Sequence, residues 1–260
     1  MKRQAMMQWD EAAQLLSRAT RIVLITHIAP DGDAIGSALG LAWALRQLGK
    51  SAWVAVDDGV PSALRFLPGA EDVRRSPGDV SPDLVIAVDC ADESRMGKAG
   101  EKARAVGVPL INLDHHMTNT LFGDVNLVDG ETVAAAEGVY DWLPRLGVQI
   151  DAAIATCLLT GIVTDTLCFR TNNVTAAVLG KAQHLMEAGA PLNEITQRTV
   201  MRKPYAALRL WAQVMPTVQL QDGIIWAVID QQAREAVNMA DGGDGGLVSL
   251  LLSADEANIA

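Results

Sequence analysis

The first 190 residues alternate short apolar runs with longer stretches in which apolar residues follow helical spacing. The short runs are rich in valine and isoleucine and are bounded by turn-forming residues, which predicts buried strands. The predicted strands are 22–26, 51–56, 83–88 and 109–113. The predicted helices are 34–48, 132–146, 152–165 and 175–189. Such alternation predicts an α/β fold with a mostly parallel, Rossmann-like sheet flanked by helices.

The pattern changes near residue 190. A polar stretch of helical character is followed by two apolar runs, 216–220 and 224–229, which a tight Gln-Asp-Gly turn should join as a hairpin. The glycine-rich residues 241–246 are expected to form a loop, followed by a short helix. We therefore expect a small α/β domain that is incomplete. The expected parts are the main domain 1–190, the linker helix 191–215 and the partial domain 216–260.

Composition is typical of a globular protein, with 50% hydrophobic residues and a mean hydropathy of +0.17. No apolar run reaches the roughly 18 residues that a membrane span requires, so no membrane association is expected. The first 19 residues are typical of an amphipathic helix rather than a signal peptide. Cys90, Cys157 and Cys168 are odd in number and widely spaced, which favours buried thiols in a reducing cytoplasm over disulfides or a zinc site.

The formal net charge of −10 argues against a protein that binds long DNA or RNA through a basic surface. A small phosphorylated substrate remains compatible with this charge if bound cations reverse its sign locally.

Polar residues gather where the predicted strands end. His27, Asp31 and Asp33 follow the first strand, Asp89 follows the third, and the triplet 114–116 (Asp-His-His) follows the fourth. Ligands of parallel sheets bind beyond the carboxyl ends of the strands, so these side chains are expected to converge, with Asp165 joining them. Asp31 and Asp33 are two residues apart, and on an extended segment their like charges would face the same side.

Divalent cations would resolve this electrostatic problem. Carboxylates and imidazoles together suit manganese, iron, cobalt, zinc or magnesium, and the imidazole nitrogens favour a transition metal. Four carboxylates with two imidazoles are enough for two ions that share a bridge. Two ions about 3.5–4 Å apart can ionise a bridging water and stabilise the charge that develops in phosphoryl hydrolysis. A remaining histidine could donate a proton or hold a phosphate oxygen.

Each feature has an ordinary structural interpretation when taken alone. A histidine after a strand is usually just hydrogen-bonded, Asp89 could cap the next element, and Asp165 could mark a helix end. Taken together the features favour a site, because three of the four histidines follow strands beside aspartates. His184, within the helix predicted at 175–189, is expected to be structural.

Motifs of other enzyme classes are missing from the sequence. No P-loop or GxSxG elbow is present, and the glycines at 32, 36 and 40 indicate close helix packing.

Four segments carry a family resemblance: "THIAPDGDAIGS" (26–37), "VIAVDC" (85–90), "LDHH" (113–116) and "GIVTDTLCFRTNN" (161–173). In this order they resemble the DHH phosphoesterase superfamily, and most closely its NrnA-type branch of bifunctional oligoribonucleases and 3′-phosphoadenosine-5′-phosphate (pAp) phosphatases. The resemblance covers roughly residues 10–220.

The resemblance implies two metal ions, usually Mn²⁺, that share Asp89. The ligands implied for the first ion are His27, Asp31 and Asp89, and those for the second are Asp33, Asp89, His115 and Asp165. His116 would face the scissile phosphate as a general acid or a phosphate ligand, and Asp114 would orient a histidine. Arg170 would approach a substrate phosphate.

In this family a second domain, DHHA1, contains a GGGH-type motif that binds the nucleotide portion of the substrate. The sequence has no such motif, so it looks shortened at its C-terminal end, and we expect an intact metal site with impaired substrate capture.

The function that follows is a manganese-dependent phosphoesterase that hydrolyses short oligoribonucleotides or pAp through a metal-bridging hydroxide. Three alternatives stay open: a phosphodiesterase of cyclic dinucleotides (c-di-AMP or its linear product pApA), a non-catalytic nucleotide-binding module, and, less favoured by the 161–173 segment, a pyrophosphatase. Short RNA or small nucleotides are the expected partners, and a homodimer is a further expectation.

Overall fold

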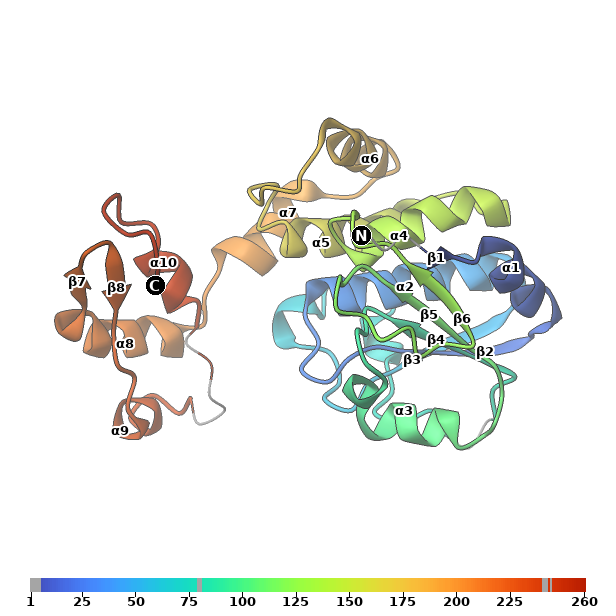
Figure 1. Ribbon diagram of the computed structural model, residues 1–260, viewed down its shortest axis with the longest axis horizontal. Coiled ribbons are helices and arrows are strands. Elements are labelled where there is room, and N and C mark those ends of the chain that lie inside the picture. Colours follow the sequence, from blue (N-terminus) through green and yellow to red (C-terminus); the bar gives the residue numbers. More distant parts are fainter. Residues whose placement is uncertain (1–5, 79–80, 240–242, 244) are drawn as a thin grey trace. The chain divides into compact units, whose positions relative to one another are not determined.

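The computed structural model describes residues 6–78, 81–239, 243 and 245–260 (Figure 1). The chain divides into two compact units, Met1–Val200 (unit 1) and Met201–Ala260 (unit 2). The division falls within a π-helical turn, Gln197–Met201. In the described part of the chain, no helix is both long and apolar enough to span a membrane.

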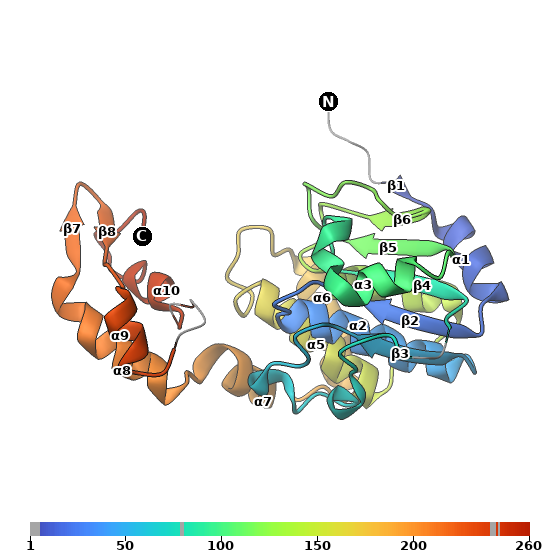
Figure 2. The same ribbon diagram turned by 90° about the horizontal axis from the view of Figure 1, so that it is seen from below.

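The described part of unit 1 contains a six-stranded sheet with the order β1-β6-β5-β4-β2-β3. Figure 2 shows the strands in this order from top to bottom. Strands β2 to β6 are parallel, whereas β1 pairs antiparallel with β6. The strands are β1 (Met6–Met7), β2 (Arg21–Ile25), β3 (Ser51–Ala55), β4 (Leu84–Val88), β5 (Leu110–Asp114) and β6 (Val125–Val128). The predicted α/β class with a mostly parallel sheet is therefore confirmed.

Helices cover both faces of this sheet. The α-helices of unit 1 are α1 (Trp9–Arg18), α2 (Gly32–Gln47), α3 (Gly97–Arg104), α4 (Ala135–Trp142), α5 (Ala152–Asp165), α6 (Ala176–Glu187) and α7 (Leu192–Thr196). The 3₁₀ helices are Ser62–Leu64, Ala70–Asp72, Glu93–Met96 and Leu143–Leu146. Figure 1 shows α2, α4 and α5 on one side of the sheet and α3 on the other.

Successive strand residues point to opposite faces, and this alternation builds two cores. On β2, Ile22 and Leu24 belong to the large core beneath α2, α4 and α5, whereas Val23 and Ile25 belong to a smaller core with Ala99 and Ala103 of α3. A strand that is buried on both faces has to be apolar throughout, which explains the continuous apolar runs of the sequence.

The connections after β2 and β4 leave in opposite directions. Helix α2 leads from β2 to β3 on one side, and α3 leads from β4 to β5 over the other face. Because β2 and β4 are neighbours, their carboxyl ends flank the topological switch point of the sheet, the place where such folds bind ligands.

Helices α2 and α5 pack closely because both carry glycine at their contact. A Cβ on Gly36 would lie 2.5 Å from the carbonyl oxygen of Cys157, and one on Gly161 would lie 2.6 Å from Oδ1 of Asp33. The close packing predicted from the glycines of α2 is confirmed.

Several sequence predictions need correction. The helix predicted from residue 34 begins at Gly32, so Asp33 lies in a first helical turn and not on an extended segment beside Asp31. The opening helix begins at Trp9, because Met6–Met7 pair with β6. The predicted thiols are all free, but only Cys90 and Cys157 are buried, since Cys168 is half-buried. Strand β6 and helix α3 lack a clear periodic signal and were not predicted.

Unit 2 has its own small core, formed by Leu210, Val214, Ile225, Val237, Leu247 and Leu251. Its elements are α8 (Tyr205–Val214), a 3₁₀ helix (Met215–Thr217), β7 (Gln219–Gln221), β8 (Ile224–Trp226), α9 (Gln231–Glu235) and α10 (Leu247–Leu251). The predicted hairpin is present, joined by Asp222 and Gly223, both with positive φ as a type I′ turn requires. Its first strand is shorter than predicted, because residues 216–217 belong to the 3₁₀ helix. The expected 241–246 loop lies largely outside the described residues.

Candidate metal centre

Four separate segments bring the predicted ligands to the switch point of the sheet. His27 lies just beyond β2, Asp89 directly follows β4, His115 directly follows β5, and Asp165 is the last residue of α5. Asp31 is the N-cap of α2, where its Oδ1 accepts hydrogen bonds from the backbone N–H groups of Asp33 and Ala34 at 3.0 Å each. The DGD turn is thus also a helix start.

The first group of potential ligands contains His27, Asp31 and Asp89. Nε2 of His27 lies 3.4 Å from Oδ2 of Asp89 and 3.9 Å from Oδ1 of Asp31. The other ring nitrogen, Nδ1, lies 2.8 Å from the carbonyl oxygen of Ile28, which orients the ring. Burial lowers the pKa of His27, but its contacts with Asp89, Ile28 and Asp31 outweigh this effect and leave the pKa raised.

The second group contains Asp33, His115 and Asp165. Nε2 of His115 lies 3.9 Å from Oδ2 of Asp33 and 3.6 Å from Oδ2 of Asp165. Asp33 is 1% exposed, and its two oxygens accept hydrogen bonds from the N–H groups of Ala135 (2.6 Å) and Ala136 (2.9 Å), at the start of α4. The N-terminus of a helix favours negative charge, so α4 holds this carboxylate in place.

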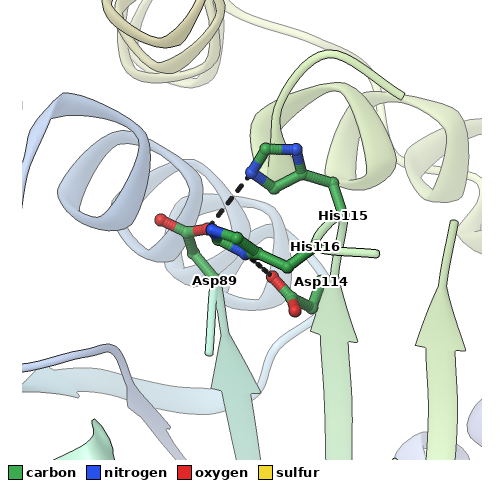
Figure 3. Close-up of side chains that lie close together, drawn as sticks. All are labelled: Asp89, Asp114, His115 and His116. Carbon is green, nitrogen blue, oxygen red and sulfur yellow. Dashed lines mark hydrogen bonds and ion pairs between the residues drawn. The ribbon is translucent and has the colours of Figure 1, made fainter. Parts of the chain in front are cut away.

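Asp89 belongs to the first group and also faces the second. While its Oδ2 faces His27, its Oδ1 lies 3.6 Å from Nε2 of His115 (Figure 3). Oδ1 is buried and has no hydrogen-bond partner among the described residues. A buried carboxylate oxygen without a donor is costly, and a cation placed between these groups would satisfy it.

The burial and mutual repulsion of the carboxylates provide a second indication that a cation fits here. Burial, followed by the charges of Asp89 and Asp165, raises the pKa of Asp33 well above its usual value. Burial likewise raises the pKa of Asp165, with the charges of Asp89 and Asp31 adding to the effect. Bound cations would offset the repulsion between these carboxylates. The donor set of carboxylate oxygens and imidazole nitrogens suits a divalent transition metal.

His116 points toward the same place but is held differently. Its Nδ1 donates to Oδ1 of Asp114 at 2.8 Å, and this bond, together with the charges of Asp114 and Asp89, raises the pKa of His116 to about 9 (Figure 3). Asp114 in turn accepts a 2.6 Å hydrogen bond from Nδ2 of Asn119. Although burial favours the neutral acid, the bonds from His116 and Asn119 lower the pKa of Asp114, so the two residues form an ion pair.

Asn119 was missed from the sequence, although it follows the Asp-His-His triplet closely. It is buried, and its Nδ2 also donates to Oδ1 of Asn112 (2.8 Å) and to the carbonyl oxygen of Cys90 (3.0 Å). One amide group therefore ties the loop after β5 to the loop after β4, which carries Asp89.

A cavity of about 280 Å³ opens at this site, lined by His27, Asp31, Asp89, Ala91, Arg95, His116 and Asp165. Arg95 was not singled out in the sequence, although it lies in the same loop as Asp89. Arg170, which was, does not line this cavity; it is exposed and its Nε donates to the carbonyl oxygen of Leu167 at 2.7 Å. His184 is also elsewhere, with Nδ1 2.8 Å from the hydroxyl of Tyr140.

Backbone strain accompanies the site. Asp89 has φ 58°, and Leu167, Cys168 and Phe169, just after Asp165, have φ of 49°, 62° and 61°. Left-handed conformations are uncommon outside glycine, and strained residues of this kind cluster at functional sites.

Comparison with known proteins gives a consistent result. The sequence model of the DHH family, N-terminal domain, matches residues 21–162. The chain is 43% identical over 207 residues to the bifunctional oligoribonuclease and PAP phosphatase NrnA of Thermus thermophilus, covering 78% of this chain and 60% of that protein. It is 26% identical to the probable NrnA of Streptococcus mutans, covering 88% of this chain and 72% of that protein.

A crystal structure of an exopolyphosphatase-related protein from Bacteroides fragilis has the same fold. It superimposes with a TM-score of 0.88 at 24% identity, covering 96% of this chain and 77% of that one. The residues matched by the family model include His27, Asp31, Asp33, Asp89 and the triplet 114–116. On this match, the chain belongs to the DHH family.

Proposed function

We propose that this chain is a phosphoesterase that works with two divalent cations, Mn²⁺ being the preferred ion. The observation that carries the proposal is the position of Asp89, whose Oδ2 faces His27 and whose Oδ1 faces His115. Each histidine belongs to a separate group of three potential ligands. A carboxylate that presents one oxygen to each group suits a bridge between two ions.

In this proposal His27, Asp31 and Asp89 hold one ion, and Asp33, Asp89, His115 and Asp165 hold the other. Two bound cations lower the pKa of water and balance the negative charge that develops on a phosphate in the transition state. The chain contributes the fixed geometry, because backbone N–H groups hold Asp31 and Asp33 and the Ile28 carbonyl orients His27.

His116 supplies a proton or a hydrogen bond to the substrate. With a pKa of about 9 it is charged at neutral pH. Asp114 occupies its Nδ1, so Nε2 is the atom that would donate to a leaving oxygen or a phosphate oxygen. Asp114 and Asn119 would keep the ring in this orientation.

Short oligoribonucleotides and pAp are the substrates that we propose. The names of the Thermus and Streptococcus relatives support this class, although the chain spans 60% of the length of the Thermus protein. The net charge of −10 and a cavity of about 280 Å³ fit a small phosphorylated ligand better than a long polymer. We further propose that residues 191–215 connect the catalytic domain to residues 216–260, which form part of a substrate-binding domain together with α8, whose Leu210 and Val214 lie in the core of unit 2.

The test is to incubate the purified chain with Mn²⁺ and separately with pAp, an RNA of two to five nucleotides, cyclic di-AMP and pyrophosphate, and to rank the initial rates. We expect hydrolysis of pAp and the short RNA that a chelator abolishes and added Mn²⁺ restores. Fastest turnover of cyclic di-AMP would favour a cyclic-dinucleotide phosphodiesterase instead. Nucleotide binding without turnover of any of the four would identify a non-catalytic module.

A further inference from the structure

Arg95 brings a positive charge to an otherwise acidic cavity. Besides Arg95 and Ala91, the lining consists of three aspartates and two histidines. Arg95 belongs to the 3₁₀ helix Glu93–Met96, whose N-cap Asp92 accepts a 2.9 Å hydrogen bond from the N–H of Ser94. The carbonyl oxygen of Arg95 accepts a 2.8 Å hydrogen bond from the N–H of Ile28. Its backbone is therefore fixed against the loop that carries His27.

The guanidinium of Arg95 faces a nitrogen that cannot accept its proton. Nη2 lies 3.2 Å from Nδ1 of His27, and the same Nδ1 lies 2.8 Å from the carbonyl oxygen of Ile28. A carbonyl oxygen has no hydrogen, so Nδ1 must carry the proton and donate it to Ile28. Nδ1 then has no lone pair left for Arg95.

No carboxylate of the described residues neutralises the Arg95 guanidinium. Within the described ranges, the Arg95 guanidinium forms no ion pair, in contrast to Arg104, which pairs with Glu93 at 2.9 Å and with Asp124 at 3.4 Å. Arg95 is therefore an exposed, positively charged residue that lines the cavity and has guanidinium N–H groups available to a ligand. The planar fork of a guanidinium matches two oxygens of a phosphate.

We propose that Arg95 binds the non-bridging oxygens of the substrate phosphate, on the His27 side of the cavity. This inference rests on the proposed function and adds a specificity-determining residue to it. Arg170, which does not line the cavity and donates to the Leu167 carbonyl, does not have this role in the proposal.

The competing explanation is that Arg95 only positions His27, which it contacts. The two roles predict different losses: a phosphate ligand affects phosphorylated ligands alone, whereas a residue that positions His27 affects metal binding. The variants are Arg95→Gln, which removes the charge, and Arg95→Lys, which keeps the charge without the fork. Lys98→Gln is the matched control, because Lys98 is exposed in the same segment and does not line the cavity.

Calorimetry with the Mn²⁺-loaded chain should measure the affinity for AMP and for adenosine, and a separate titration should measure the affinity for Mn²⁺. We expect Arg95→Gln to weaken AMP binding by about 10- to 100-fold, the loss typical of hydrogen bonds to charged groups. Adenosine and Mn²⁺ affinities should stay unchanged, Arg95→Lys should be intermediate, and Lys98→Gln should match the wild type.

Unchanged AMP affinity in Arg95→Gln would overturn the inference, as would a parallel fall in Mn²⁺ affinity. If the wild type hydrolyses pAp and Arg95→Gln does so equally well, the inference fails while the proposed function stands. If the wild type hydrolyses none of the test substrates but binds AMP through Arg95, the phosphate contact stands and the proposed function fails.

Discussion

Oδ2 of Asp89 lies 3.4 Å from Nε2 of His27, and Asp89 holds this position from a left-handed backbone with φ 58°. The conformation follows directly after β4, so it redirects the chain at the edge of the sheet. Aspartate and asparagine are the residues that most readily tolerate it after glycine. The residue with the left-handed backbone is thus also the potential ligand that faces both groups.

Asp89→Asn should abolish metal-dependent hydrolysis while preserving the fold. Asparagine keeps the shape and the left-handed backbone, but it removes the charge that would serve both ions. We expect Mn²⁺ affinity and turnover to fall by roughly 100-fold or more. This loss exceeds the effect typical of a residue that only hydrogen-bonds to a metal ligand. Mn²⁺ titration and initial rates with pAp measure this, and circular dichroism checks the fold.

Asp89→Ala serves as the comparison, because alanine adds backbone strain of about 1–2 kcal/mol at this φ. It should be less stable than Asp89→Asn but equally inactive. Unchanged turnover in Asp89→Asn would remove the two-cation mechanism from consideration.

The ends of the central strands could be predicted from the sequence, whereas several elements and side chains around them could not. Strands β2, β4 and β5 are buried on both faces, so their apolar runs were visible and located His27, Asp89 and Asp114. The strand β6 is only four residues long and gave no comparable signal. Arg95 could not be recognised, because its place in the lining of the cavity depends on the three-dimensional fold and not on a motif.

The two aspartates of the DGD turn illustrate the same limit. Their spacing suggested like charges side by side. Because α2 begins at Gly32, Asp31 caps this helix, whereas the buried Asp33 lies in its first turn and accepts a hydrogen bond from the start of α4. Which of these arrangements forms depends on the packing of α2 against α4 and α5. Local spacing alone does not encode that packing.

Asp114→Asn should shift the titration of His116. The bond to Asp114 is the main cause of the raised pKa, so its loss should return the pKa from about 9 toward the ordinary 6.5. Because its pKa is raised, the His116 ring is fully charged below 6.5 and loses its proton as the pH rises through about 9. Activity that needs the charged ring should therefore fall above that pH. In Asp114→Asn the fall should move to lower pH.

The measurements are pH–rate profiles and NMR titration of the His116 ring in the metal-free chain. Asp83→Asn is the control, because Asp83 accepts hydrogen bonds from Thr20 and Arg21 and has no bond to His116. Identical His116 titration in wild type and Asp114→Asn would show that Asp114 does not set this pKa.

Lys181 is predicted to be critical for stability. Its Nζ donates to Oε1 of Glu137 and to Oδ2 of Asp141, both at 2.7 Å, and joins α6 to α4. Oε2 of Glu137 accepts a hydrogen bond from the N–H of Val133, two residues before the start of α4. The first N–H groups of α4 are those that bind Asp33. Lys181→Met leaves the buried Glu137 carboxylate without its cation and should cost about 3–5 kcal/mol of unfolding free energy.

Denaturation in urea should measure this cost, and a double-mutant cycle should locate its origin. Lys181→Met combined with Glu137→Gln should recover much of the stability, since no unpaired buried charge remains. Simple additivity of the two substitutions would show that the pair is not coupled.

Gly36→Ala should separate α2 from α5, the helices that carry Asp33 and Asp165. The new methyl group would lie 2.5 Å from the Cys157 carbonyl oxygen, a backbone atom that cannot move without its helix. We expect a loss of about 1–3 kcal/mol in unfolding free energy, as is typical of overpacking. Because both helices position potential ligands, Mn²⁺ affinity should fall as well.

Gly180→Ala provides the matched control, because Gly180 lies within α6 and a Cβ there would have no atom within 4 Å. Alanine should stabilise this helix by about 0.5–1 kcal/mol, since it restricts the unfolded chain more than glycine does. Chemical denaturation and Mn²⁺ titration of both variants compare the two positions directly. If Gly36→Ala kept full Mn²⁺ affinity despite reduced stability, the spacing of α2 and α5 would have no part in holding the ligands.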